Sequence, residues 1–130
     1  MLAFLVMAAG CGGGTVTPYR FQKDAESLSS TAQDGAVLAK GTAEGETTSP
    51  YTRVHASELG KEAGQLADVL RSAHPEPGLA AKIAKLVRLA ERASDELERL
   101  EDSPADHDVA RRARSNLSDI SDEATKLGGG

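Results

Sequence analysis

The sequence predicts an all-α protein, an antiparallel four-helix bundle of up-down-up-down topology that follows an apolar leader and a flexible tether. Apolar residues recur three and four positions apart along four segments, as they do on one face of a helix. Prolines mark the start of three of these segments, and no alternating apolar and polar run is long enough for a strand. We expect helices over residues 19–43, 51–73, 79–101 and 105–127, a bundle spanning 19–127, and a flexible tail at 128–130. Short connections force successive helices to run antiparallel.

The predicted helix starts share one device, a hydroxyl residue followed by proline. It occurs at Thr17-Pro18, Ser49-Pro50 and Ser103-Pro104. The hydroxyl can accept a hydrogen bond from a free N–H of the first turn, and proline has no N–H to leave unpaired there. Asp106 adds negative charge near the third start, where it suits the helix dipole. The break before residue 79 is the proline-rich stretch 74–78, which cannot lie inside a helix.

The 79–101 segment has the most regular pattern, a heptad seam with charged residues off the seam. The seam consists of Leu79, Ile83, Leu86, Ala90, Ala93, Leu97 and Leu100. The 105–127 segment repeats the pattern through Val109, Ala113, Leu117, Ile120, Ala124 and Leu127, and the 51–73 segment carries Val54, Leu59, Ala63, Leu66, Leu70 and Ala73. The 19–43 segment keeps the spacing through Phe21, Ala25, Leu28, Ala32, Ala36 and Ala39. Each glycine in it costs up to about 1 kcal/mol relative to alanine, so we expect its C-terminal end to fray.

Composition excludes several classes of function. The 130 residues include two Phe, two Tyr and no Trp, too few for a platform on which nucleobases stack. Fifteen Lys and Arg against 20 Asp and Glu give a net charge of -5, which disfavours binding to a phosphate backbone or to anionic lipid. We therefore expect no nucleic-acid partner. The single cysteine, Cys11, excludes an intramolecular disulfide and a four-thiolate metal site.

The leader is the most informative segment for function. Residues 1–9 carry no charge, are almost wholly apolar, and are followed by Gly10-Cys11 and three glycines. The apolar run is too short to span a bilayer, which takes about 20 residues. The segment resembles a bacterial lipoprotein signal whose lipobox is Ala8-Ala9-Gly10-Cys11. A plain signal peptide or a packed terminus are the alternatives.

The resemblance implies a signal peptide at residues 1–10 and cleavage before Cys11. It further implies a diacylglyceryl group on the Cys11 sulfur and acylation, for example by palmitate, of the new N-terminus. Residues 11–18 would then be a lipid-anchored Gly/Thr tether, and the protein would lie on the outward face of a bacterial cell membrane. Without lipidation, we expect a secreted or periplasmic protein.

One group of side chains has the chemistry of a ligand site. His55, Glu58 and Glu62 are three and four positions apart, so they share one helix face. His107 opens the 105–127 segment, at the same end of the predicted bundle. Facing helices can hold metals with such groups, but a solvated flank is the simpler interpretation. We assign no metal or other cofactor and keep these four residues as candidates.

No pattern for nucleophilic catalysis is present, and the cysteine is assigned to the lipid. We therefore expect no enzyme. The sequence favours a non-enzymatic, membrane-anchored bacterial envelope lipoprotein that acts as a structural or protein-interaction module, with self-association through helix faces as a further possibility. The alternative is a helical bundle that binds a metal or small ligand through His55, Glu58, Glu62 and His107.

Overall fold

The computed structural model describes residues 15–129. Over these residues the chain forms four helices, α1 (Pro18–Ala43), α2 (Ser49–Ser72), α3 (Ala80–Asp102) and α4 (His107–Leu127). Two short strands, β1 (Thr15–Val16) and β2 (His74–Pro75), pair with each other. The prediction of an all-α, bundle-like fold is confirmed. No helix of the described part is long and apolar enough to cross a membrane.

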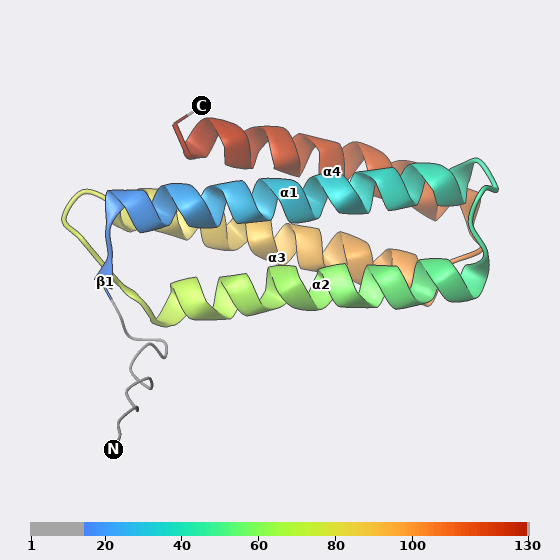
Figure 1. The fold of residues 1–130 in the computed structure, drawn as a ribbon, viewed down its shortest axis with the longest axis horizontal. Helices are drawn as coiled ribbons and strands as arrows, with labels where there is room; N and C mark the ends of the chain where they lie inside the picture. Colours follow the sequence, from blue (N-terminus) through green and yellow to red (C-terminus); the bar gives the residue numbers. More distant parts are fainter. Residues whose placement is uncertain (1–14, 130) are drawn as a thin grey trace, which may run out of the picture.

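The helices lie side by side along the long axis of the molecule, and each begins near the end at which the preceding helix stops (Figure 1). α1 packs most extensively against α4, and α2 against α3, whereas the α3–α4 and α1–α2 contacts are smaller. The Ser29 hydroxyl of α1 lies 2.8 Å from that of Thr125 of α4. On the other pair, the Ser94 hydroxyl of α3 donates to the Gly60 carbonyl of α2 at 3.2 Å. The bundle therefore consists of two closely packed helix pairs.

Small residues allow these close approaches. The core holds many alanines between a few large side chains, and the fully buried leucines and isoleucine are Leu28, Leu86, Leu97, Leu100, Leu117 and Ile120, with Leu70 at 1% exposure. A Cβ atom on Gly35 would lie 3.0 Å from Leu97 Cδ2 and 3.1 Å from Leu117 Cδ1. Gly35 thus lies where α1 meets both α3 and α4. The expectation that glycines would fray this helix is wrong, because α1 continues to Ala43 with Gly35 and Gly41 buried.

The helix caps agree with the predictions in part. Thr17 caps α1, and its side chain accepts a hydrogen bond from the Arg20 N–H at 3.2 Å, as predicted. α2 is capped one residue earlier than predicted, by Thr48 rather than Ser49. The predicted cap of the last helix is wrong, because α4 begins at His107 and is capped by Asp106. The Asp106 carboxylate accepts from the N–H groups of Asp108 and Val109 at 2.9 and 3.1 Å, whereas Ser103, three residues earlier, caps neither donor.

The strand pair corrects the predicted tether. β1 and β2 run parallel, with Thr15 opposite His74 and Val16 opposite Pro75. The Glu76 N–H donates to the Val16 carbonyl at 3.2 Å, and the Val16 side chain is fully buried. From residue 15 onward the predicted tether therefore belongs to the folded body, because burial of one valine and the backbone pairing hold it there. A two-residue strand is too short to produce an alternating pattern.

One residue assigned to a helix seam and one assigned to the C-terminal tail also need correction. Val54 is 54% exposed, because it lies five residues, or about 140° of helix rotation, away from the seam position Leu59. Thr52 and Ala56 are fully buried in its place. At the other end of the chain, Gly128 does not belong to a free tail, since a Cβ on it would lie 3.0 Å from Ala25 Cβ of α1.

Candidate functional site

An open groove between α1 and α2 gathers three of the four residues that the sequence singled out. It has a volume of about 560 Å³ and lies toward the α1–α2 connection. His55, Glu58 and Glu62 of α2 line it. His107 does not line it and lies exposed at the start of α4. The structure thus unites the α2 candidates and separates the histidine of α4 from them.

The imidazole of His55 contacts both a carboxylate and an aromatic ring in this groove. Its Nδ1 atom lies 3.6 Å from a carboxylate oxygen of Glu58, one turn along the same helix. Its ring stacks at a tilt on Tyr51, with the ring centroids 4.2 Å apart. Within residues 15–129, no group of three or more His, Cys, Asp or Glu side chains is arranged to hold a metal ion. Tyr51, His55 and Glu58 therefore give this part of the groove an aromatic and acidic surface.

We call this surface the acidic groove, defined by four carboxylates around apolar side chains. The carboxylates are Asp34 on α1, Glu46 in the connection, and Glu58 and Glu62 on α2, and the lining contains no Lys or Arg. An uninterrupted set of like charges attracts a cationic partner and repels an anionic one.

Exposed apolar side chains accompany the carboxylates. Val37 and Tyr51 line the acidic groove and are 60% and 52% exposed, and Leu38 and Leu59 line it below them. Val54, one turn after Tyr51, is exposed as well. An aromatic ring and aliphatic side chains inside a charged rim are typical of a surface that binds another protein.

A cluster of threonines, of which Thr42 and Thr52 are buried and Thr47 is half-buried, fixes the connection at the end of the acidic groove. The hydroxyl of Thr52 lies 2.9 Å from that of Thr42 and 2.8 Å from that of Thr47. Thr42 also donates to the Leu38 carbonyl at 3.0 Å, and Thr47 itself lines the groove. These bonds tie the end of α1, the connection and the start of α2 together, so the groove is a preformed feature of the bundle.

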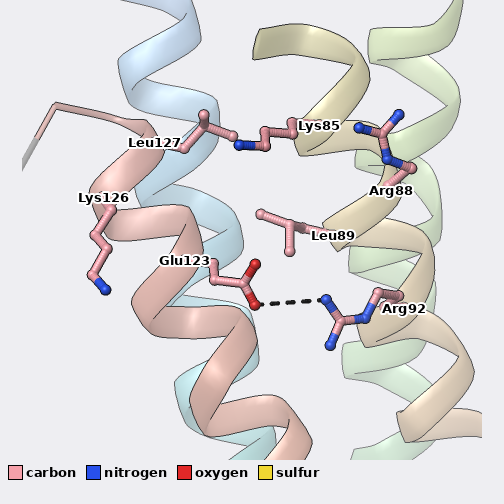
Figure 2. A pocket seen from close by; sticks show the side chains of 7 residues that line it. All are labelled: Lys85, Arg88, Leu89, Arg92, Glu123, Lys126 and Leu127. Carbon is pink, nitrogen blue, oxygen red and sulfur yellow. Dashed lines mark ion pairs between the residues drawn. The ribbon is translucent and has the colours of Figure 1, made fainter. Parts of the chain in front are cut away.

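A second groove, between α3 and α4, was missed by the sequence analysis. Figure 2 shows its lining, which consists of Lys85, Arg88, Leu89, Arg92, Glu123, Lys126 and Leu127. We call it the basic groove, because four cations surround one carboxylate in a volume of about 440 Å³. The signal in the sequence is the spacing of Lys85, Arg88 and Arg92, three and four positions apart on one helix face.

The predicted lipidation site, Cys11, lies outside the described residues. The first described residue after it in the sequence is Thr15 of β1, which lies at the end of the bundle where α1 and α3 begin and α2 and α4 end (Figure 1). The acidic groove lies toward the opposite end.

Comparisons with protein-family models, with curated proteins and with solved structures find no match.

Proposed function

We propose that this chain is a non-enzymatic bacterial envelope lipoprotein, anchored through acyl groups on Cys11, whose bundle recruits a protein partner in the acidic groove. The lipobox-like sequence Ala8-Ala9-Gly10-Cys11 supports the anchor. Two or more acyl chains would hold the protein firmly, at about 0.8 kcal/mol for each buried methylene. We further propose up-down-up-down topology for the bundle, which the short connections between helices support.

The position of the acidic groove carries the proposal of a protein partner. Thr15 comes four positions after Cys11, so the anchor would lie within about 14 Å of β1. The groove begins at Asp34, about 24 Å along α1 from Pro18 at a rise of 1.5 Å per residue. An anchored bundle would therefore present the groove away from the membrane, where it is accessible to another envelope protein.

The chemistry of the groove specifies the partner. Four carboxylates around Val37 and Tyr51 suit a segment that carries Lys or Arg on either side of apolar residues. An amphipathic basic helix has this pattern and would fit along the seam between α1 and α2. We therefore propose that the partner contributes such a segment.

Intact-mass spectrometry of protein made by its native host tests the anchor. We expect a chain that begins at Cys11 and carries the added mass of the diacylglyceryl and acyl groups. The Cys11→Ala variant is expected to retain its leader and to lose this added mass. A native chain with Met1 still attached and a bare sulfur would refute the anchor.

Crosslinking in intact cells tests the partner site. Tyr51→Lys places a cation among the carboxylates and removes the ring, and we expect it to abolish recovery of the partner. Tyr19→Lys is the matched control, because Tyr19 is 69% exposed on α1 and does not line the groove. Equal recovery with both variants would refute the role of the groove, whether or not the anchor is present.

A further inference from the structure

The basic groove is a second surface whose charge opposes that of the molecule as a whole. The chain carries a net charge of -5, yet four cations and one carboxylate line this groove. Arg92 pairs with that carboxylate, Glu123, at 3.6 Å. Lys85, Arg88 and Lys126 form no ion pair with any other residue in the 15–129 range. Three cations along this groove are therefore free of ion pairs within the described residues.

Helix stability does not account for this arrangement. Lys82 and Lys85 lie in the first two turns of α3, close to the positive end of its dipole, where acidic residues are favoured. The first turn of α3 contains no acidic residue, and its N-cap, Leu79, makes no side-chain cap bond. By contrast, α4 has Asp106 and Asp108 at its start. The cations of α3 thus add to the positive potential of the helix start instead of offsetting it.

The floor of the basic groove is apolar. Leu89 is buried beneath the cations, and Leu127 is half-buried at the end of α4. Figure 2 shows both leucines between the two helices, together with the charged ends of Lys85 and Arg92, whereas the ends of Arg88 and Lys126 point to opposite outer sides of the groove. A ligand that fills the groove therefore meets cations at the rim and hydrocarbon at the base.

The basic groove also lies at the end of the bundle that carries β1. It is formed by the first half of α3 and the last turns of α4, and both lie toward the end of the bundle where α1 begins (Figure 1). This is the end opposite the acidic groove.

We propose that the basic groove binds an anionic phospholipid of the membrane, with its phosphate against Lys85 and with Arg88 and Lys126 on either side of it. The first part of its hydrocarbon lies over Leu89 and Leu127. Lipid bound there fixes one side of the bundle against the membrane surface and directs the acidic groove away from it. Charge repulsion favours the same orientation, because anionic headgroups repel the carboxylates of the acidic groove.

Flotation with vesicles tests the proposal on the full chain carrying Cys11→Ala, which removes the acyl anchor and separates lipid binding from lipidation. The vesicles contain phosphatidylcholine alone or phosphatidylcholine with phosphatidylglycerol. The groove variant adds Lys85→Gln, Arg88→Gln and Lys126→Gln. The matched control adds Lys61→Gln, Arg112→Gln and Arg114→Gln, three exposed cations outside the groove.

We expect the parent and the control to prefer phosphatidylglycerol vesicles, and this preference to decrease as salt is raised. The groove variant is expected to lose on the order of a hundredfold in partitioning to these vesicles, from three cations near a charged surface. Equal loss in groove and control variants would show an effect of net charge alone and would overturn the proposal. Equal binding by all three chains would overturn it too.

Two further measurements separate a lipid from other occupants. Short-chain soluble phosphatidylglycerol is expected to bind the parent chain more tightly than inorganic phosphate, because only the lipid covers Leu89 and Leu127. Equal affinity for the two would reduce the groove to a simple anion site and overturn the lipid assignment. Sedimentation of parent and groove variant is expected to give the same oligomeric state, and loss of a dimer in the variant would assign the groove to contact between copies instead.

Discussion

Replacing Gly35 with alanine tests how closely α1 approaches α3 and α4. The added Cβ would lie 3.0 Å from Leu97 Cδ2 and 3.1 Å from Leu117 Cδ1, closer than carbon atoms normally approach. Both leucines are fully buried, so neither can move its methyl group into solvent. The new methyl must therefore displace core side chains.

The size of the effect follows from two opposing contributions. Alanine is favoured over glycine inside a helix by about 1 kcal/mol. Overpacking a well-filled core costs about 1–3 kcal/mol. We therefore expect Gly35→Ala to lower the free energy of unfolding by roughly 0–2 kcal/mol, in spite of its better helix propensity.

Gly64→Ala supplies the matched control. A Cβ on Gly64 would lie 3.5 Å from Ser94 Oγ, an ordinary contact distance. This variant keeps the propensity gain without the clash, so we expect it to raise the free energy of unfolding by about 0.5–1 kcal/mol. Urea denaturation followed by far-UV circular dichroism measures both values. Equal stabilisation by the two alanines would mean that α1 lies farther from α3 and α4 than the structure shows, and would refute the reasoning.

Three further predictions concern stability. Burial raises the pKa of Asp24, and the positive charge of Arg20 offsets part of this rise. One oxygen of the Asp24 carboxylate is buried without a hydrogen-bond partner. The folded state thus binds this proton more tightly than the unfolded state, so the charged carboxylate costs stability at neutral pH. We expect Asp24→Asn to raise the thermal midpoint at pH 7 and this gain to vanish as the pH falls below the usual aspartate pKa; a gain that persists in acid would contradict this cause. Asp106→Ala should cost about 0.5–2 kcal/mol in urea unfolding through loss of the α4 cap, whereas Ser103→Ala should cost almost nothing, and equal losses would contradict the assigned cap. Thr52→Val removes one buried and one partly buried hydroxyl contact and should cost about 1–3 kcal/mol by the same assay, whereas a neutral result would show that the threonine cluster does not stabilise the connection.

The helices could be predicted from sequence because their core spacing is a local property. The heptad seam from Ile83 to Leu100 is buried throughout, and α3 differs from the predicted range by one residue at each end. Helix boundaries were less predictable where two caps compete. Ser103-Pro104 has the pattern of a helix start, but the carboxylate of Asp106 satisfies two backbone donors and determines where α4 begins.

Features that join distant segments could not be predicted in this way. Val16 pairs with Pro75, and nothing in either short segment indicates the other. Gly35 stays helical because it faces Leu97 and Leu117, whereas propensity alone counts it as a weakness. Both grooves depend on which helices become neighbours. The acidic groove was found in part, because His55 and its carboxylates lie on one helix, whereas the basic groove draws on two helices.

The short strand pair also determines how the bundle responds to a pull on the start of the chain. Because β1 is bonded to β2 and to Glu76, tension applied ahead of Thr15 reaches the link between α2 and α3 as well as the first turn of α1. Both helix pairs then share the load, and the buried Val16 side chain must leave the core before α1 can be peeled away. The two residues of β1 thus transmit force from the start of the chain to both helix pairs of the bundle.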